Sequence, residues 1–138
     1  SISRRELMLV GSALYWGEGT KNYSKRNYEK LSFTNSDVTM IKIFMKFVRE
    51  ILKVEDSSIY AGINVYPGMD VAKLKTFWSK ILMLPEKHFY IFRQISRASQ
   101  GKKKWNHLPY GTLNLRINNR KHYHVIMGMI DGLFSGIA

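Results

Sequence analysis

Apolar residues recur at helical spacing in four segments of the chain, and a residue type that caps helix N-termini precedes each one. In the first segment Ser3 and Glu6 have the spacing of a capping box. Its expected apolar face consists of Leu7, Val10, Leu14 and Gly17. The four expected helices cover residues 3–18, a segment after the turn at 35–37, residues 70–82, and about 119–134.

Between these helices, shorter segments alternate apolar and polar residues as half-buried strands do. Residues 20–35 have the pattern of a hairpin, and Pro67-Gly68 ends the strand that follows the second helix. The expected strands cover residues 20–28, 31–34, 59–66, 89–96 and 110–118. The alternation of helices and strands predicts one α+β domain over residues 1–138.

The charge balance points to a polyanionic partner. The chain has 138 residues, 22 of them lysine or arginine and 10 acidic, giving a net charge of +12 and a pI near 10.0. We expect nucleic acid before an acidic membrane as this partner. No apolar run approaches the roughly 18 residues that span a bilayer. With no signal peptide recognisable, we expect a soluble, intracellular protein. Since the sequence starts at Ser1 and enters a helix almost at once, we expect a fragment of a longer chain.

The basic residues are concentrated in two groups. One lies in the acid-free run between Glu86 and Asp131 and comprises Lys87, Arg93, Arg97, Lys102, Lys103, Lys104, Arg116, Arg120 and Lys121. The other lies in the first hairpin and comprises Lys21, Lys25, Arg26 and Lys30. A solvated, solubilising surface is the alternative, but phosphate binding explains the asymmetry better.

The end of the first helix combines small residues with a single acid. Gly11, Ser12, Ala13 and Gly17 would let another helix approach closely, with Ala13 and Gly17 on one face. Glu18 follows, and Gly19 is expected to end the helix in the left-handed conformation. Unpaired carbonyls gather at a helix C-terminus, so an acid there needs either solvent or a cation. An exposed carboxylate without a role is the alternative.

Residues 11–19 resemble the nine-residue LAGLIDADG signature of homing endonucleases. Trp16 departs from it, because an acid is usual there, and Tyr15 is bulkier than the usual aliphatic residue. The residues that keep its character are Ala13, Leu14, Gly17, Glu18 and Gly19. The element order is also similar to the family's αββαββα core, in which a saddle-shaped antiparallel sheet covers DNA. One further helix, residues 70–82, is expected between strands.

The resemblance implies a homodimer in which the first helices of two copies cross. Its interface would be formed by Gly11, Ala13, Leu14 and Gly17. Glu18 of each copy would hold Mg²⁺ near a scissile phosphate of double-stranded DNA. Gln94 and Arg116 lie on strands that the family uses near these phosphates, and Arg116 resembles a basic residue that stabilises the transition state. A phosphate contact without catalytic duty is equally open for Arg116.

Two other functions remain open at this point. The fold also resembles degenerate LAGLIDADG domains of certain bacterial regulators, which bind DNA through an attached helix-turn-helix; a module of this kind would keep the fold but have lost cleavage. Trp16 favours that interpretation, and retention of Glu18 argues against it. An RNA-binding, maturase-like role on the same basic surface is a third hypothesis.

Overall fold

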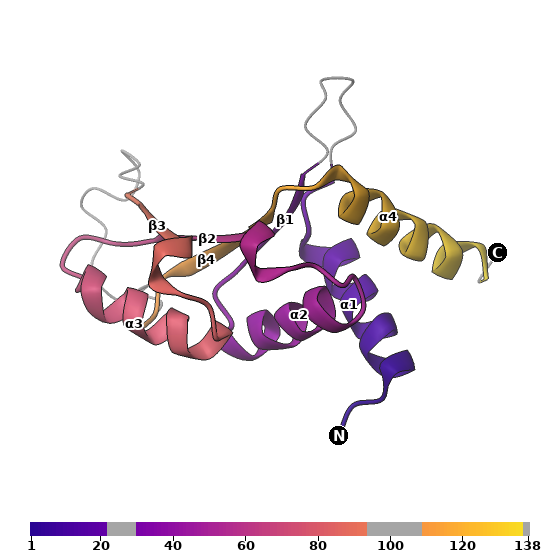
Figure 1. Ribbon diagram of the computed structural model, residues 1–138, viewed down its shortest axis with the longest axis horizontal. Helices are drawn as coiled ribbons and strands as arrows, with labels where there is room; N and C mark the ends of the chain where they lie inside the picture. Colours follow the sequence, from indigo (N-terminus) through magenta and orange to yellow (C-terminus); the bar gives the residue numbers. More distant parts are fainter. Residues whose placement is uncertain (22–29, 94–108, 137–138) are drawn as a thin grey trace.

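The computed structural model describes residues 1–21, 30–93 and 109–136. Within them the chain forms four α-helices and a four-stranded sheet (Figure 1). Short 3₁₀ turns precede β2 and β3. The elements are α1 (Arg4–Glu18), β1 (Leu31–Asn35), α2 (Val38–Glu50), β2 (Ile59–Asn64), α3 (Val71–Leu82), β3 (Phe89–Phe92), β4 (Thr112–Ile117) and α4 (Arg120–Ser135).

Each α-helix begins where the sequence predicts a cap. The side chain before the helix accepts a hydrogen bond from a backbone N–H of the first turn, which satisfies a donor that has no partner within the helix. At α1 the capping box is complete, since Glu6 Oε2 also accepts from the backbone N–H of Ser3 at 2.6 Å. The capping residues are Ser3, Asp37, Asp70 and Asn119.

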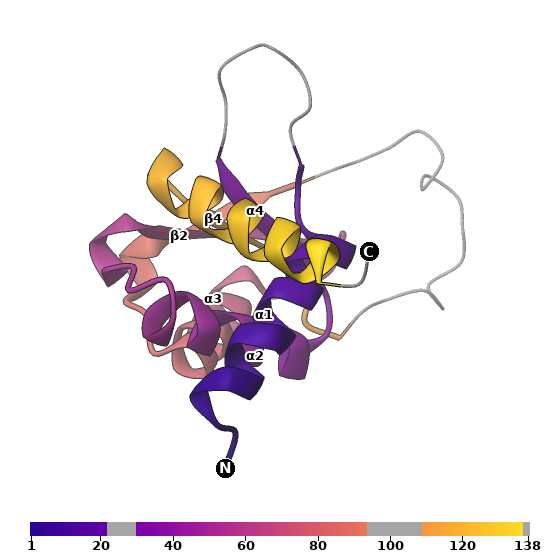
Figure 2. The ribbon, with the colours of Figure 1, turned by 90° about the vertical axis from the view of Figure 1, so that its right-hand side faces the viewer.

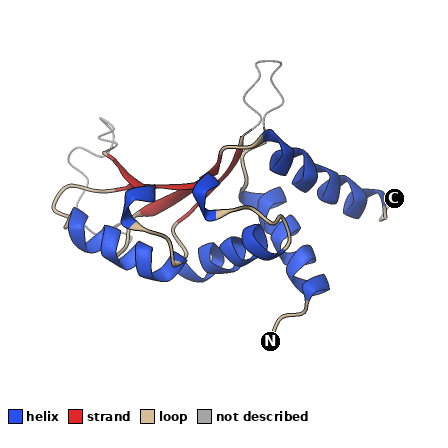
Figure 3. Cartoon of the chain, in the orientation of Figure 1, coloured by secondary structure: helices blue, strands red, loops and turns tan. Residues whose placement is uncertain are grey.

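Helices α2 and α3 lie beneath the sheet, and α4 lies beside α1 at the other end of the molecule (Figures 1 and 2). The core fills the layer between the sheet and these helices. In β4, Leu113, Leu115 and Ile117 are fully buried, while the residues between them point to the opposite face. No helix in the described part of the chain covers that opposite face, which we call the outer face of the sheet (Figure 3).

The sheet is mixed, so the expectation of an antiparallel sheet is wrong for one pair of strands. The strand order is β1-β4-β2-β3, with β4 antiparallel to both of its neighbours and β2 parallel to β3. The cause is α3, the additional helix expected at residues 70–82. It carries the chain back along the sheet, as a parallel pair requires, and places β3 at an edge. The first strand of the expected hairpin falls largely on residues 22–29, outside the described residues.

Helix α1 buries a different face from the one expected. Its buried residues are Leu7, Gly11, Ser12 and Tyr15, whereas Val10 and Leu14 are half-buried and Gly17 is exposed. A Cβ atom on Gly11 would overlap the ring of Phe47 in α2, so this glycine permits close contact within the chain. The Ser12 hydroxyl lies 3.8 Å from the Met129 sulfur of α4. Gly11 therefore serves packing within the chain, and its place in a dimer interface stays a prediction.

Gly19 also departs from its predicted conformation. Its backbone is extended (φ −78°, ψ 154°) rather than left-handed, and it forms a β-bridge with Phe33. A Cβ at Gly19 would overlap the ring of Tyr15. The glycine is needed for the close approach of an aromatic ring, and the helix ends because the chain continues into the sheet.

The two glycines of α1 that were expected at a helix contact should respond oppositely to alanine. Gly11→Ala is expected to lower the free energy of unfolding by about 1–3 kcal/mol, because Phe47 is fully buried and cannot move aside. A Cβ atom at Gly17 would have no neighbour within 4 Å, so Gly17→Ala is expected to raise the free energy of unfolding by up to about 1 kcal/mol. Urea unfolding followed by circular dichroism measures both. Equal effects at the two sites would contradict this packing.

Candidate nucleic-acid interface

The outer face of the sheet carries a continuous set of side chains from four strands. In the register of the sheet, Arg116 of β4 lies between Ser32 of β1 and Tyr60 of β2, and Asn64 of β2 lies beside Phe92 of β3. Directly paired residues point to the same face. The residues that alternate with the core positions on this face are Ser32, Thr34, Tyr60, Gly62, Asn64, Tyr90, Phe92, Thr112, Asn114 and Arg116.

On β1 and β4 this face is polar and organised by Asn114. The Asn114 side-chain amide donates to the Ser32 hydroxyl at 2.9 Å and to the Thr34 hydroxyl at 2.5 Å. Its amide oxygen accepts from Arg116 Nε at 2.8 Å. Arg116 is thereby oriented by a neutral partner through Nε, and the residue as a whole is exposed. A guanidinium held in this way can pair with a phosphate through two parallel hydrogen bonds.

On β2 and β3 the face is aromatic. The Phe92 ring lies 5.7 Å from the Arg116 guanidinium carbon and 4.8 Å from the Tyr90 ring, edge to face. A Cβ on Gly62 would lie 2.6 Å from Phe92 and 2.8 Å from Tyr90, so both rings lie over this glycine. Sequence reasoning missed these aromatic residues. The sequence does contain a signal that could have found them: Tyr90 and Phe92 are two apart in β3 and therefore lie on the face opposite Phe89 and Ile91.

None of the described residues on this face is acidic, and two acids next to the sheet are held by the helices beneath it. Asp56, which precedes β2, forms a two-point ion pair with Arg49 of α2 at 2.8 and 3.1 Å. Glu86, which precedes β3, accepts from the Thr76 hydroxyl of α3 at 2.9 Å. The outer face therefore presents only neutral and basic groups, which suits a polyanion.

The C-terminal end of α1 is joined to β1 by a short set of hydrogen bonds. The buried Tyr15 hydroxyl donates to the Thr20 carbonyl at 2.5 Å, and the Thr20 N–H donates to the Ser32 carbonyl at 2.9 Å. Glu18 lies between these points and is exposed. Ser32 of β1 pairs with Arg116 of β4, the only arginine on the outer face of the described strands. The end of α1 and Arg116 are therefore both next to β1.

Glu18 is the only acid at this end of α1 among the described residues, and the described part of the chain contains no group of three His, Cys, Asp or Glu side chains that could hold a metal. A single exposed carboxylate still fits Mg²⁺, which keeps several waters and takes one or two carboxylates plus phosphate oxygens. Glu18 therefore suits a metal shared with a substrate and a second chain, and does not form a closed site alone.

The side of α1 that faces solvent forms an apolar ridge, consisting of Leu9, Ala13, Trp16 and Gly17. Trp16 is 43% exposed and contacts the ring of Phe134 in α4, itself 61% exposed, at 6.4 Å between centroids. Leu14 is half-buried against the core. Of the predicted interface, Ala13 and Gly17 are thus accessible to a second copy.

The predicted DNA-binding residues divide into three sets. The Lys21 ammonium donates to the Trp16 carbonyl, so it caps the C-terminus of α1. The exposed members are Lys30, Arg93, Arg116, Arg120 and Lys121. Those outside the described residues are Lys25, Arg26, Arg97, Lys102, Lys103 and Lys104, together with the predicted catalytic Gln94.

No protein-family model, curated protein or solved structure matches this chain. The resemblance to the LAGLIDADG family therefore rests on the residues themselves. Among the described helices, none has the length and apolar character needed to cross a membrane.

Tyr15→Phe tests whether the tyrosine hydroxyl fixes the end of α1. Removing the hydrogen bond to Thr20 is expected to cost about 1 kcal/mol of unfolding free energy at pH 8. Burial raises the pKa of Tyr15 to about 12 from the ordinary value of 10.0. The stabilisation by the Tyr15 hydroxyl should therefore be complete in the wild type below pH 10 and be lost as the pH rises toward 12. The variant has no hydroxyl at this position, so its stability should not show this loss. Urea unfolding of both proteins at several pH values measures the difference, and parallel pH profiles would contradict the assignment.

Proposed function

We propose that this chain is a DNA-binding protein of the LAGLIDADG homing endonuclease type, which cleaves duplex DNA as a homodimer with Mg²⁺. The observation that carries the proposal is the acid-free outer face of the sheet, bordered by the helix end that presents Glu18. A DNA substrate places the protein inside the cell, in the cytoplasm or nucleoid.

DNA binding follows from the chemistry of the outer face. The exposed Arg116 on this face can neutralise a phosphate, and the exposed Arg93 just beyond the end of β3 can neutralise another; each such contact releases condensed counterions. The amide of Asn114 and the hydroxyl of Thr34 can exchange hydrogen bonds with base edges in a groove. Since α2 and α3 lie beneath the sheet and no helix in the described part of the chain covers the outer face, a long duplex can reach this face (Figure 1).

Cleavage would use the carboxylate at the end of α1. When bound, Mg²⁺ supplies charge neutralisation at the phosphate and a more acidic water. Glu18 would hold the ion through its exposed carboxylate, and Arg116 would orient the phosphate from the neighbouring strand. One chain provides one such carboxylate, so cutting both strands calls for two copies.

The dimer would form through the apolar ridge of α1. Ala13 and Gly17 are four residues apart on the exposed side and offer little or no side chain, so a second α1 helix can approach closely. A two-fold contact of this kind buries the same ridge on both copies, including Leu9 and Trp16. It would also bring the two Glu18 carboxylates close to each other.

Trp16 supports a second candidate, a regulator module that binds DNA without cutting it. It stands where an acid is usual in the signature, and its ring packs on Phe134 instead of adding a charge beside Glu18. A plasmid nicking assay with Mg²⁺ and with EDTA separates the two candidates. Metal-dependent nicking supports the endonuclease, and binding without nicking supports the regulator.

Duplex binding should fall steeply as salt rises. If about five phosphates are neutralised, the log–log slope of the binding constant against salt is expected near −4 to −5. Arg116→Gln should weaken binding several-fold and reduce the slope by about 1, because one phosphate contact is lost. Fluorescence anisotropy with a labelled duplex at several salt concentrations measures both quantities.

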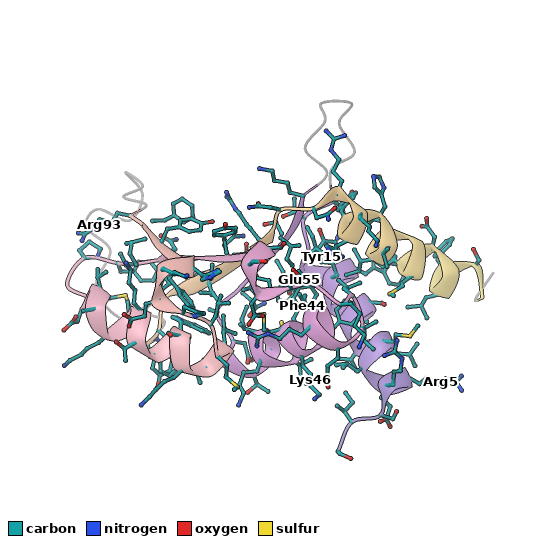
Figure 4. The ribbon with its side chains drawn as sticks, in the orientation of Figure 1. Arg5, Tyr15, Phe44, Lys46, Glu55 and Arg93 are labelled. Atoms are coloured by element: carbon teal, nitrogen blue, oxygen red, sulfur yellow. The ribbon has the colours of Figure 1, made fainter. Side chains whose placement is uncertain are left out.

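Arg5→Gln is the matched control for Arg116→Gln. It makes the same change of charge on α1, at the end of the molecule opposite Arg93 (Figure 4). The affinity of Arg5→Gln for the duplex and the slope of its binding constant against salt should both stay close to the wild-type values. Affinity that is independent of salt, or equal losses in the two variants, would contradict binding on the outer face.

Glu18→Gln keeps the shape of the side chain and removes its charge. Cleavage is expected to fall at least about a hundredfold, because a positioned charge at a phosphoryl-transfer site is lost. Duplex binding without metal should change little, and stability should stay equal or rise slightly, since an anion leaves a helix C-terminus. Plasmid nicking, anisotropy and urea unfolding give the three measurements. Equal cleavage by wild type and variant would show that the site is assigned wrongly.

Ala13→Arg separates the dimer from the metal site. It leaves Glu18 unchanged and places a charge on the exposed ridge, so light scattering should give a monomeric mass with an unchanged circular dichroism spectrum. Loss of double-strand cleavage is expected to accompany the monomeric mass. A monomeric wild type that cuts both strands would overturn the dimer.

A further inference from the structure

We propose that the aromatic half of the outer face, formed by Tyr60, Tyr90 and Phe92, binds unpaired bases of single-stranded nucleic acid by stacking. The inference rests on the proposed function only in taking the outer face as the nucleic-acid surface. It adds a substrate class, because a paired duplex presents base edges and keeps its base planes stacked on one another.

Two of the three rings are exposed well beyond what packing requires. Tyr60 and Phe92 are each 38% exposed, on adjacent strands and on the same face as Arg116. Tyr90 is more enclosed, and its ring covers Gly62, which gives it a structural role. The Phe92 ring also covers Gly62, and the Tyr60 ring lies 5.7 Å from the ring of His88, but neither contact buries the exposed surface of these two side chains. Flat, exposed rings on a sheet are the surface on which single-stranded bases stack.

The charges around the rings match a nucleic-acid strand. Arg116 lies over the Phe92 ring at 5.7 Å, and the exposed Arg93 follows Phe92 directly in the chain. A strand whose bases stack on Phe92 and Tyr60 would have the Arg116 guanidinium close to its phosphates. Because none of the described residues on this face is acidic, nothing there repels the backbone.

Two polar atoms among the rings have no partner in the described part of the chain. The Tyr90 hydroxyl and the Asn64 amide oxygen are buried without a hydrogen bond. Buried polar atoms ordinarily pair, and leaving one unpaired costs stability. Both atoms are buried and so are not open to a base edge in this conformation; the proposal rests on the exposed rings and the charges around them.

The alternative interpretation is that Tyr60 and Phe92 are packing residues left partly exposed, with no role in binding bases. It predicts that Phe92 and Tyr60 contribute to stability and that any nucleic-acid affinity is electrostatic. Stacking predicts instead that affinity depends on the presence of bases. A comparison of normal and abasic strands distinguishes these two, because both strands carry the same phosphates.

The test uses fluorescence anisotropy with three labelled probes: an oligothymidylate of about 12 nucleotides, an abasic strand of equal length, and a duplex. Wild type is expected to bind oligothymidylate about tenfold more tightly than the abasic strand. Phe92→Leu and Tyr60→Leu should reduce this ratio, and the double variant should bring it close to one. Because the ratio is measured within one preparation, partial unfolding of a variant cannot imitate the effect.

Phe134→Leu is the matched control, since it removes an exposed ring that lies on α4 and away from the sheet. It should keep the wild-type ratio. A wild-type ratio near one, or equal changes in the control and in Phe92→Leu, would overturn the stacking proposal. Duplex binding is measured separately. If the wild type does not bind the duplex but prefers oligothymidylate to the abasic strand, the proposed duplex function alone is contradicted. If the wild type binds the duplex but binds oligothymidylate and the abasic strand equally, stacking alone is contradicted.

Discussion

The pairing of β4 with two neighbours is the constraint on which the rest of the structure depends. It is the strand that joins β1 to β2, and its residues Leu113, Leu115 and Ile117 are fully buried over α2 and α3. Because successive side chains of a strand alternate, this burial forces Asn114 and Arg116 onto the opposite face. A shift of register by one residue would exchange the core for the binding surface, so the same hydrophobic contacts that stabilise the domain also fix its candidate site.

The end of α1 connects this sheet to the candidate chemistry. Tyr15 and Gly19 form a close contact that admits no side chain at residue 19, and Thr20 continues into a hydrogen bond with β1. Glu18 is held between two fixed points while its carboxylate remains in solvent. Its position is therefore set by Tyr15, three residues before it, and by Gly19 and Thr20, directly after it, which lets an exposed side chain project from a fixed place.

Local features of the sequence predicted the fold well, and features that need distant partners escaped it. The caps at Ser3, Asp37 and Asp70 act within one helical turn, so the helix starts are confirmed. The buried face of α1 was mistaken because Gly11 and Ser12 are weak hydrophobic signals, and only Phe47 and Met129 explain their burial. The aromatic surface likewise depends on which strands become neighbours. The parallel pairing that joins Tyr60, Tyr90 and Phe92 has no signature within any one of their strands.

The position of β3 at the sheet edge has a consequence for how such a domain can diversify. Helix α3 and β3 follow one another in the chain, and β3 pairs with β2 alone. Two of the three aromatic residues belong to this edge strand. Substitutions in β3 would therefore change the chemical character of the aromatic half of the surface, while the polar strands and Glu18 stayed the same.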